Sequence, residues 1–194
     1  MDLKERAYSV LIVSAADKFN ASLQELLPQS KYSPVRIEAS ISLAKRTILE
    51  RDYDFVIINS PLPDADGIRF AIDICSSKNS VVLLMVRSEI YSDVFAKVSL
   101  HGVDTLPKPS SKQIVNQALD WMSSTRERLR KLEKKTVSLE DKMQEIRIIN
   151  RAKWILIDQL KMTEEDSHRY IEKQAMDRCV SKKEIAESII KTYG

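Results

Sequence analysis

Charged side chains in the C-terminal half of this sequence are its best candidates for chemistry, and that chemistry is binding rather than catalysis. Residues 110–194 hold 18 Lys and Arg against 14 Asp and Glu, whereas residues 1–109 hold 13 against 14. The excess of +4 is compatible with an anionic partner, although solvated helix faces explain it at least as often. No His/Cys cluster, Ser-His-Asp arrangement, carboxylate pair or glycine-rich phosphate loop can be assigned. We therefore expect no enzymatic activity, no metal and no cofactor.

Length and composition indicate one domain of ordinary size and a smaller one. The chain has 194 residues, 43% of them hydrophobic, which is enough to form a core. Its longest apolar runs, Val81–Val86 and Phe55–Ile58, are strand-sized and too short to span a membrane. These short runs predict a soluble protein. Cys75 and Cys179 lie far apart in the sequence, so we expect free thiols and a cytoplasmic location.

Segments typical of strands and helices alternate along the first part of the chain. The strand-like segments are Tyr8–Val13, Val35–Ala39, Asp54–Asn59, Val81–Val86 and Val103–Leu106. The helix-like segments between them are Phe19–Leu27, Ile41–Glu50, Ile68–Cys75 and Ser92–Leu100. Asp66-Gly67 is a turn pair that accommodates positive φ. The alternation predicts a five-stranded parallel sheet covered on both faces, with its functional crevice at the C-terminal strand ends.

Two motifs at those strand ends resemble bacterial response-regulator receiver domains. The run from Asp54 to Gly67 is similar to the segment around the third receiver strand, and Leu106-Pro-Lys-Pro109 is similar to the Lys-Pro after the fifth. The resemblance covers residues 7 to 122 and implies the flavodoxin-like receiver fold, an α/β class.

The phosphorylation chemistry of that family is not matched. Asn59 stands where receivers have the phosphate-accepting aspartate, and Ser14 and Ala15 replace the acids that hold magnesium. A hydroxyl-bearing residue after the fourth strand also gives way to Met85 or Val86. An amide is a poor nucleophile, and magnesium prefers carboxylate oxygens. We therefore expect a degenerate pseudo-receiver in which Lys108 hydrogen-bonds local carbonyls.

A heptad pattern predicts that the helix after the receiver-like region enters a coiled coil. Its seam comprises Met122, Thr125, Leu129, Leu132, Thr136, Leu139, Met143, Ile146 and Asn150. With Leu129 at position a, Leu132 and Leu139 fall at d, which favours a parallel homodimer. Opposite charges such as Lys135 and Glu140 would face each other across it, whereas Lys142 and Arg147 would repel. An intramolecular helical hairpin is the alternative, and Asn150 either pairs across the axis or marks where the helices splay.

The last segment is expected to form three helices over about 139–160, 164–177 and 182–192. Thr163 followed by acids predicts an N-cap, and Ser181 with Glu184 predicts a capping box. The expected core comprises Ile149, Ala152, Ile155, Leu156, Leu160, Tyr170, Ile171, Ala175, Ile185, Ala186 and Ile189.

This segment resembles the ANTAR module of transcription antitermination regulators over residues 137 to 192. The resemblance is carried by Ala152-Lys153, Leu156 and Gln174-Ala175-Met176. Two residues depart from the family pattern, because Trp154 stands at a usual glycine and Ser167 at a usual alanine.

The ANTAR resemblance implies a dimer that binds paired hairpin loops of a nascent leader RNA and so prevents terminator formation. RNA loops require cations for phosphates and flat groups for unpaired bases. The candidate residues are Arg147, Arg151, Lys153, Trp154, His168, Arg169, Lys173, Arg178, Lys182 and Lys183. We expect Arg151, Lys153 and Arg178 to matter most. His168 is more typical of a surface histidine, and Trp154 of a packing residue than of a stacking platform.

The sequence thus predicts a pseudo-receiver over residues 1–122, a coiled-coil linker over 123–146 and an ANTAR RNA-binding module over 147–194. Its function would be that of a non-enzymatic, dimeric antitermination regulator, with a sensor protein acting on the receiver or coil. Two alternatives are a protein-interaction adaptor and a phosphorylated two-component regulator that acts on DNA.

Overall fold

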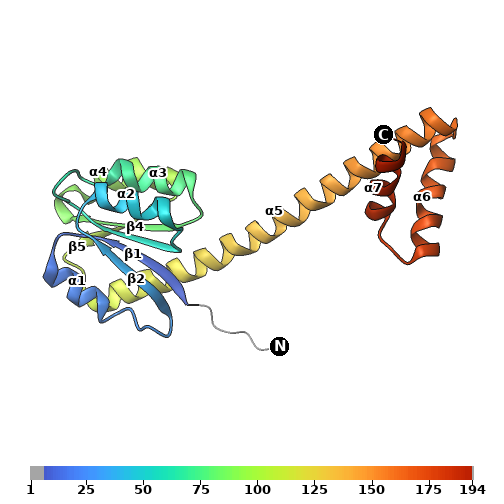
Figure 1. Ribbon diagram of the computed structural model, residues 1–194. Helices are drawn as coiled ribbons and strands as arrows, with labels where there is room; N and C mark the ends of the chain where they lie inside the picture. Colours follow the sequence, from blue (N-terminus) through green and yellow to red (C-terminus); the bar gives the residue numbers. More distant parts are fainter. Residues whose placement is uncertain (1–6, 194) are drawn as a thin grey trace. The chain divides into compact units, whose positions relative to one another are not determined.

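The computed structural model describes residues 7–193, and the chain divides into two compact units between Arg130 and Lys131. The first unit is built on a parallel sheet of five strands in the order β2-β1-β3-β4-β5 (Figure 1). The strands are β1 (Tyr8–Val13), β2 (Tyr32–Glu38), β3 (Phe55–Asn59), β4 (Val81–Arg87) and β5 (Asp104–Lys108). This order is that of the flavodoxin-like fold, as the alternating segments predicted.

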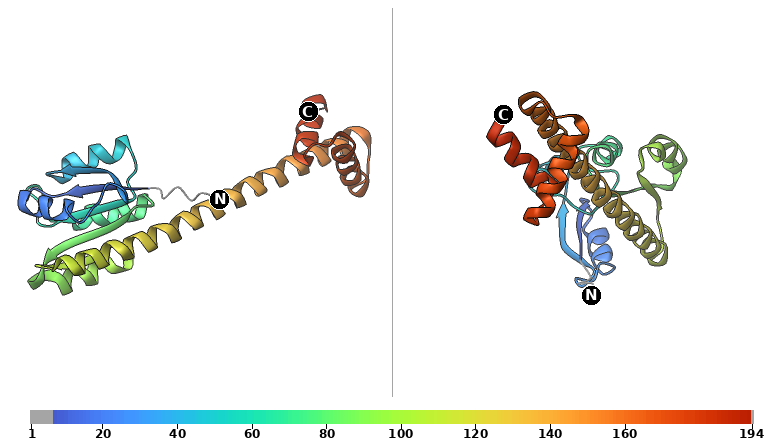
Figure 2. Two further views of the ribbon diagram at one scale, coloured as in Figure 1. Left: turned by 90° about the horizontal axis from the view of Figure 1, so that it is seen from below. Right: turned by 90° about the vertical axis from the view of Figure 1, so that its right-hand side faces the viewer.

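Helices cover both faces of this sheet (Figures 1 and 2). They are α1 (Asp17–Gln24), α2 (Ile41–Glu50), α3 (Ile68–Ser77), α4 (Tyr91–Val98) and the first part of α5 (Lys112–Leu160), with short 3₁₀ turns at Ser88–Ile90 and Ser99–His101. One core joins α2, α3 and α4 to the sheet, and the other joins α1 and α5 to the opposite face. Every residue of β3 is buried, which accounts for its unbroken apolar run.

Two local features differ from or refine the sequence prediction. Strand β2 begins at Tyr32 rather than Val35, and its register against β1 shifts between Tyr8 and Val10. Pro34 is tolerated there because β2 lies at the edge of the sheet. The predicted positive φ occurs at Gly67, where a Cβ atom would lie 2.9 Å from Cγ2 of Ile58.

The half-buried carboxylate of Asp54 ties the first part of α5 to the sheet. Its Oδ1 accepts hydrogen bonds from Arg126 Nε at 2.8 Å and from an Arg130 terminal nitrogen at 2.9 Å. Its Oδ2 accepts from the backbone and hydroxyl of Ser9. The Arg130 guanidinium also lies 5.0 Å from the centre of the Tyr8 ring, whose hydroxyl donates to Glu127.

This anchoring corrects the N-terminal end of the predicted coiled-coil seam. Met122 is 1% exposed in the core between α5 and the sheet, and Leu129 packs against the same core. Met122 cannot meet a second helix and Leu129 is partly covered, because the heptad spacing here serves packing within the chain. The first unit consequently extends to Arg130 instead of ending at residue 122.

The second unit consists of the rest of α5, α6 (Glu164–Arg178) and α7 (Lys182–Tyr193). Its core contains Ala152, Leu156, Ile171, Ala175, Ile185, Ala186 and Ile189. The expected core members Leu160 and Tyr170 are instead 44% and 37% exposed. Ser167 is fully buried, and its hydroxyl donates to the Glu164 carbonyl, so it replaces an alanine without leaving a polar group unsatisfied.

Both predicted helix starts of this unit are confirmed. The Thr163 hydroxyl accepts from the backbone N–H of Asp166 at 3.1 Å. Ser181 accepts from the backbone of Glu184, whose carboxylate in turn accepts from Ser181.

Between residues 7 and 193, no helix combines the length and apolarity that crossing a membrane requires.

Replacing Asp54 by Asn should destabilise the first unit, because Arg126 and Arg130 would lose the carboxylate that joins them to the sheet, while Arg130 keeps its ion pair with Glu127. We expect unfolding to become easier by roughly 2 to 4 kcal/mol at pH 7 in urea titrations. The exposed pair of Asp52 and Lys78 provides the control, and Asp52→Asn should change stability by less than about 1 kcal/mol. Equal effects of the two substitutions would contradict the anchoring role of Asp54.

The same anchor predicts a pH dependence. Burial by itself raises the pKa of Asp54, but the Arg126, Ser9 and Arg130 contacts outweigh it and hold the pKa below its usual value. A lowered pKa in the folded state gives stability that is present above the ordinary pKa and lost as the pH falls through the folded value. The stability difference between the native chain and Asp54→Asn should therefore shrink as the pH falls below the ordinary Asp pKa of about 3.9.

Candidate functional site

The receiver crevice holds a closed network of neutral polar groups around one lysine. Asn59 Nδ2 donates to Ser14 Oγ at 3.0 Å, joining the ends of β3 and β1. Lys108 Nζ, at the end of β5, donates to Asn59 Oδ1 and to the Ser60 carbonyl, each at 2.5 Å. Ser14 and Asn59 are both buried. The expected contact of Lys108 with local carbonyls is thus present, and the amide of Asn59 is its second acceptor.

The charge of this network is positive. Burial, together with the charge of Arg87, lowers the pKa of Lys108. Ala15 supplies only a methyl group, and Met85 pairs with Asn59 across the strands without a hydroxyl. Within residues 7–193, no group of three or more His, Cys, Asp and Glu side chains is placed to hold a metal ion. Ser14, Ala15 and Asn59 therefore bring no carboxylate to this crevice.

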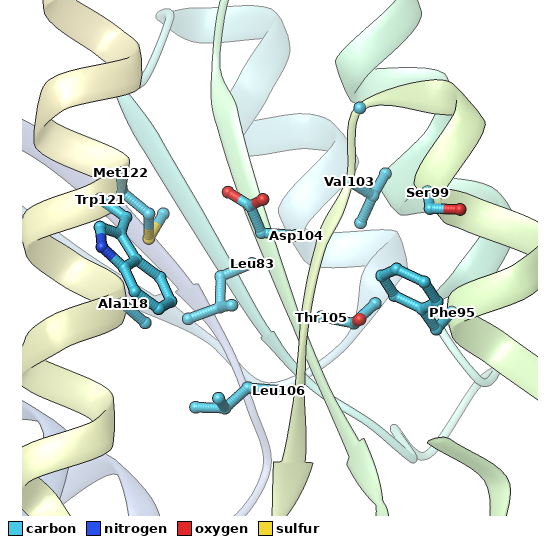
Figure 3. A pocket seen from close by; sticks show the side chains of 11 residues that line it. Leu83, Phe95, Ser99, Val103, Asp104, Thr105, Leu106, Ala118, Trp121 and Met122 are labelled. Atoms are coloured by element: carbon cyan, nitrogen blue, oxygen red, sulfur yellow. The ribbon is translucent and has the colours of Figure 1, made fainter. Parts of the chain in front are cut away.

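A second concavity of about 350 Å³ lies beside the edge strand β5. Figure 3 shows the Trp121 ring of α5 and the Phe95 ring of α4 on opposite sides of that strand. These rings are 62% and 47% exposed. Burial raises the pKa of the nearby Asp104 carboxyl. This surface was not predicted. In the sequence, the signal for it was the position of Trp121 next to the heptad residue Met122.

Four of the predicted RNA-binding cations are exposed and free of ion pairs in the part of the chain that the structure describes: Arg147, Arg151, Lys173 and Arg178. Arg147 and Arg151 are one turn apart on α5 and share a face. Lys173 lies on α6, and Arg178 is the last residue of α6. Free cations of this kind can reach phosphates without first breaking an internal contact.

The other predicted basic residues are held by acids of the same unit. Lys153 donates to Glu164 at 3.1 Å and its side chain is only 16% exposed, so it links α5 to α6. Lys182 pairs with Glu172, which also contacts His168 and so links α6 to α7. Two further pairs, Arg169 with Glu165 and Lys183 with Glu187, lie along single helices. Of the three residues expected to matter most, Lys153 is held in an ion pair with Glu164, whereas Arg151 and Arg178 are not paired.

The exposed part of the predicted seam lies entirely within the second unit. Its members there are Leu132, Thr136, Leu139, Met143, Ile146 and Asn150. Trp154 follows on the same helix with 71% of its surface exposed, so it does not pack inside its own unit. An apolar row of this length on a helix surface is typical of a protein interface.

Comparison with known proteins identifies the second unit. Residues 138–190 match the model of the ANTAR domain family. Over 185 residues the chain is 25% identical to the transcriptional regulatory protein PdtaR of Mycobacterium tuberculosis, covering 95% of this chain and 90% of that protein.

Solved structures support the fold of the first unit. The signal receiver domain of an HD domain-containing protein from Pseudomonas fluorescens Pf-5 is 22% identical, with a TM-score of 0.59 over 68% of this chain and 96% of that one. The chemotaxis response regulator CheY4 of Vibrio cholerae is 16% identical, with a TM-score of 0.53 over 60% of this chain and 99% of that one. The chain thus joins a receiver fold to an ANTAR domain.

The crevice network predicts that restoring one carboxylate does not restore phosphorylation. In Asn59→Asp, the new carboxylate would pair with Lys108, while Ser14 and Ala15 still offer no acid to magnesium. Incubation with acetyl phosphate and Mg²⁺ should leave the intact mass of both the native chain and the variant unchanged. A phosphoryl adduct at residue 59 of either protein would contradict this. A receiver domain with its full set of acids serves as the positive control.

Proposed function

We propose that this chain, which joins a receiver fold to an ANTAR domain, is a dimeric RNA-binding regulator of transcription antitermination. The observation that carries the proposal is the ANTAR match over residues 138–190 together with free cations in the same segment. The similarity to a transcriptional regulatory protein over most of both chains agrees with it. The protein would act in the cytoplasm, without enzymatic activity, on hairpin loops of a nascent leader transcript.

The RNA-binding surface would use the cations that have no internal partner. Arg147 and Arg151 of α5 and Lys173 and Arg178 of α6 fit this role, since a phosphate contact then replaces only water and counterions. Lys153 and Lys182 fit it less well, because each would first have to leave a carboxylate. Loops rather than duplexes are the expected target, since the narrow major groove of A-form RNA is closed to side chains.

Dimerisation would use the exposed seam from Leu132 to Ile146. Burying four large apolar side chains from each helix provides most of the association energy, at roughly 1 to 2 kcal/mol for each side chain. Pairs such as Lys135 with Glu140 of a second copy would favour the parallel orientation. A parallel dimer places two identical RNA-binding modules at the same end, which suits a target of two hairpin loops.

Control would come from a partner protein instead of phosphorylation. The crevice presents an amide in place of an acceptor carboxylate, and its lysine is already satisfied by Asn59 and the Ser60 carbonyl. A sensor protein that binds the receiver or the coil could then separate or mask the two modules.

Gel-shift measurements on a leader RNA with two hairpins test the proposal. Arg151→Ala and Arg178→Ala should each weaken binding roughly fivefold to tenfold and reduce the salt dependence by about one ion. Lys191→Ala, at an exposed cation of α7 outside the candidate set, is the matched control and should bind like the native chain. Lys182→Ala should have an intermediate effect.

Other results would select a different function. An adaptor would show no loop-dependent RNA binding at any salt concentration. A regulator acting on DNA would bind a duplex promoter fragment at least as tightly as the hairpin leader. Either outcome would contradict the proposed function.

A further inference from the structure

The exposed seam of α5 does not end where its heptad pattern becomes polar. Leu132, Leu139, Met143 and Ile146 are each between 52% and 57% exposed. The next position of the row is Asn150, which is also exposed. Strict heptad spacing then places Lys153 on the seam, and a charged residue there would end the apolar contact.

Lys153 is already used within its own unit. Its side chain is 16% exposed and its ammonium lies 3.1 Å from Glu164 of α6. The neighbouring Trp154 is 71% exposed and is the largest exposed apolar side chain on this part of the helix. The continuation of the seam therefore has to be judged by helix geometry and exposure rather than by heptad position.

An untwisted α-helix turns away from a heptad repeat by about 20° in every seven residues. Relative to Leu132, position 153 has then turned by roughly 60° to one side, while position 154 lies roughly 40° to the other. Position 157 returns to within about 20° of the starting line. Trp154 and the half-exposed Ile157 thus continue the row Met143, Ile146 and Asn150 better than Lys153 does.

We propose that the homodimer seam shifts phase at Asn150 and continues through Trp154 and Ile157, where the second copy of this chain covers them. This inference rests on the dimer of the proposed function and adds where its interface runs. The spacing of four residues from Ile146 to Asn150 and again to Trp154 resembles the insertion that locally unwinds a coiled coil. The paired helices would stay together beyond Asn150.

A second copy suits this row better than an unrelated partner. The row is continuous with the apolar seam, and the flanking Lys135 and Glu140 are complementary when two identical helices run parallel. Asn150 on the central line can pair with its own symmetry mate through the amide. Trp154 close to a two-fold axis would meet the same ring of the other chain, and aromatic pairs favour such contact.

With this shift, the turns of α5 around Trp154 would make two kinds of contact. Ala152 and Leu156 face the core formed with α6 and α7. Trp154 and Ile157 lie on another side of the same turns and would face the second copy. Dimerisation would therefore act directly on the helix that carries Arg147 and Arg151. An exposed Trp154 could otherwise serve as a stacking surface for an RNA base, which is the competing explanation.

Cysteine cross-linking in the full chain distinguishes these arrangements. Cys179 is exposed and has φ of 52°, so Cys179→Gly removes it and suits the left-handed backbone. Burial raises the pKa of the Cys75 thiol to about 11, so it can remain. In this parent, Leu139→Cys, Lys153→Cys or Trp154→Cys is introduced, and disulfide-linked dimer is followed under mild oxidation. Circular dichroism confirms the helix content of each variant.

We expect Leu139→Cys and Trp154→Cys to cross-link at least about fivefold faster than Lys153→Cys. Faster linkage at position 153 than at 154, with rapid linkage at 139, would overturn the phase shift while leaving the dimer intact. Sedimentation as a monomer with no linkage at any position would instead overturn the dimer of the proposed function. If Trp154→Ala dimerises like the native chain and loses only RNA affinity, the ring stacks on RNA and the inference fails.

Discussion

The pairing of Asp54 with two arginines of α5 determines which part of that helix belongs to the receiver. Asp54 directly precedes the central strand β3, and its carboxylate holds Arg126 and Arg130 against the first unit. Leu129 lies between these arginines and is thereby directed into the core. Before Lys131, the heptad residue Met122 is buried and Leu129 is partly buried within one chain. The exposed part of the predicted seam begins at Leu132.

Beyond that point, α5 no longer packs on the sheet, and two of its sides have different roles. One side supplies Ala152 and Leu156 to the ANTAR module, and the Lys153–Glu164 pair strengthens the attachment of α6. Another side carries the apolar row, and Arg147 and Arg151 lie beside it without internal partners. Dimer contact, module packing and RNA contact would thus share one helix. A change in any one of these three contacts would then affect the other two.

Much of the fold could be predicted from local patterns. The buried runs of β3 and β4 and the capping signals at Thr163 and Ser181 each have a local physical cause, so spacing was sufficient to find them. The errors concern contacts between distant residues. Asp54 and Arg126 are 72 positions apart, and no short pattern records their pairing. Heptad spacing likewise shows that Met122 and Leu129 lie on one side of a helix but not which surface covers them. The candidate RNA site was found by residue type, whereas the engagement of Lys153 and Lys182 needed the structure.

The hydrogen bonds of Asn59 have a consequence for how this receiver fold can evolve. Asn59 is held by Ser14 on one side and by Lys108 on the other, so the three residues suit one another as a neutral set with a single cation. Under the proposed function, a phosphate switch at this crevice would require an acid at position 59 and acids at positions 14 and 15, and none of these changes is useful by itself. Such a requirement makes a phosphate switch hard to acquire by single mutations. Under the proposed function, selection would then act on the surface of the domain that meets a partner protein.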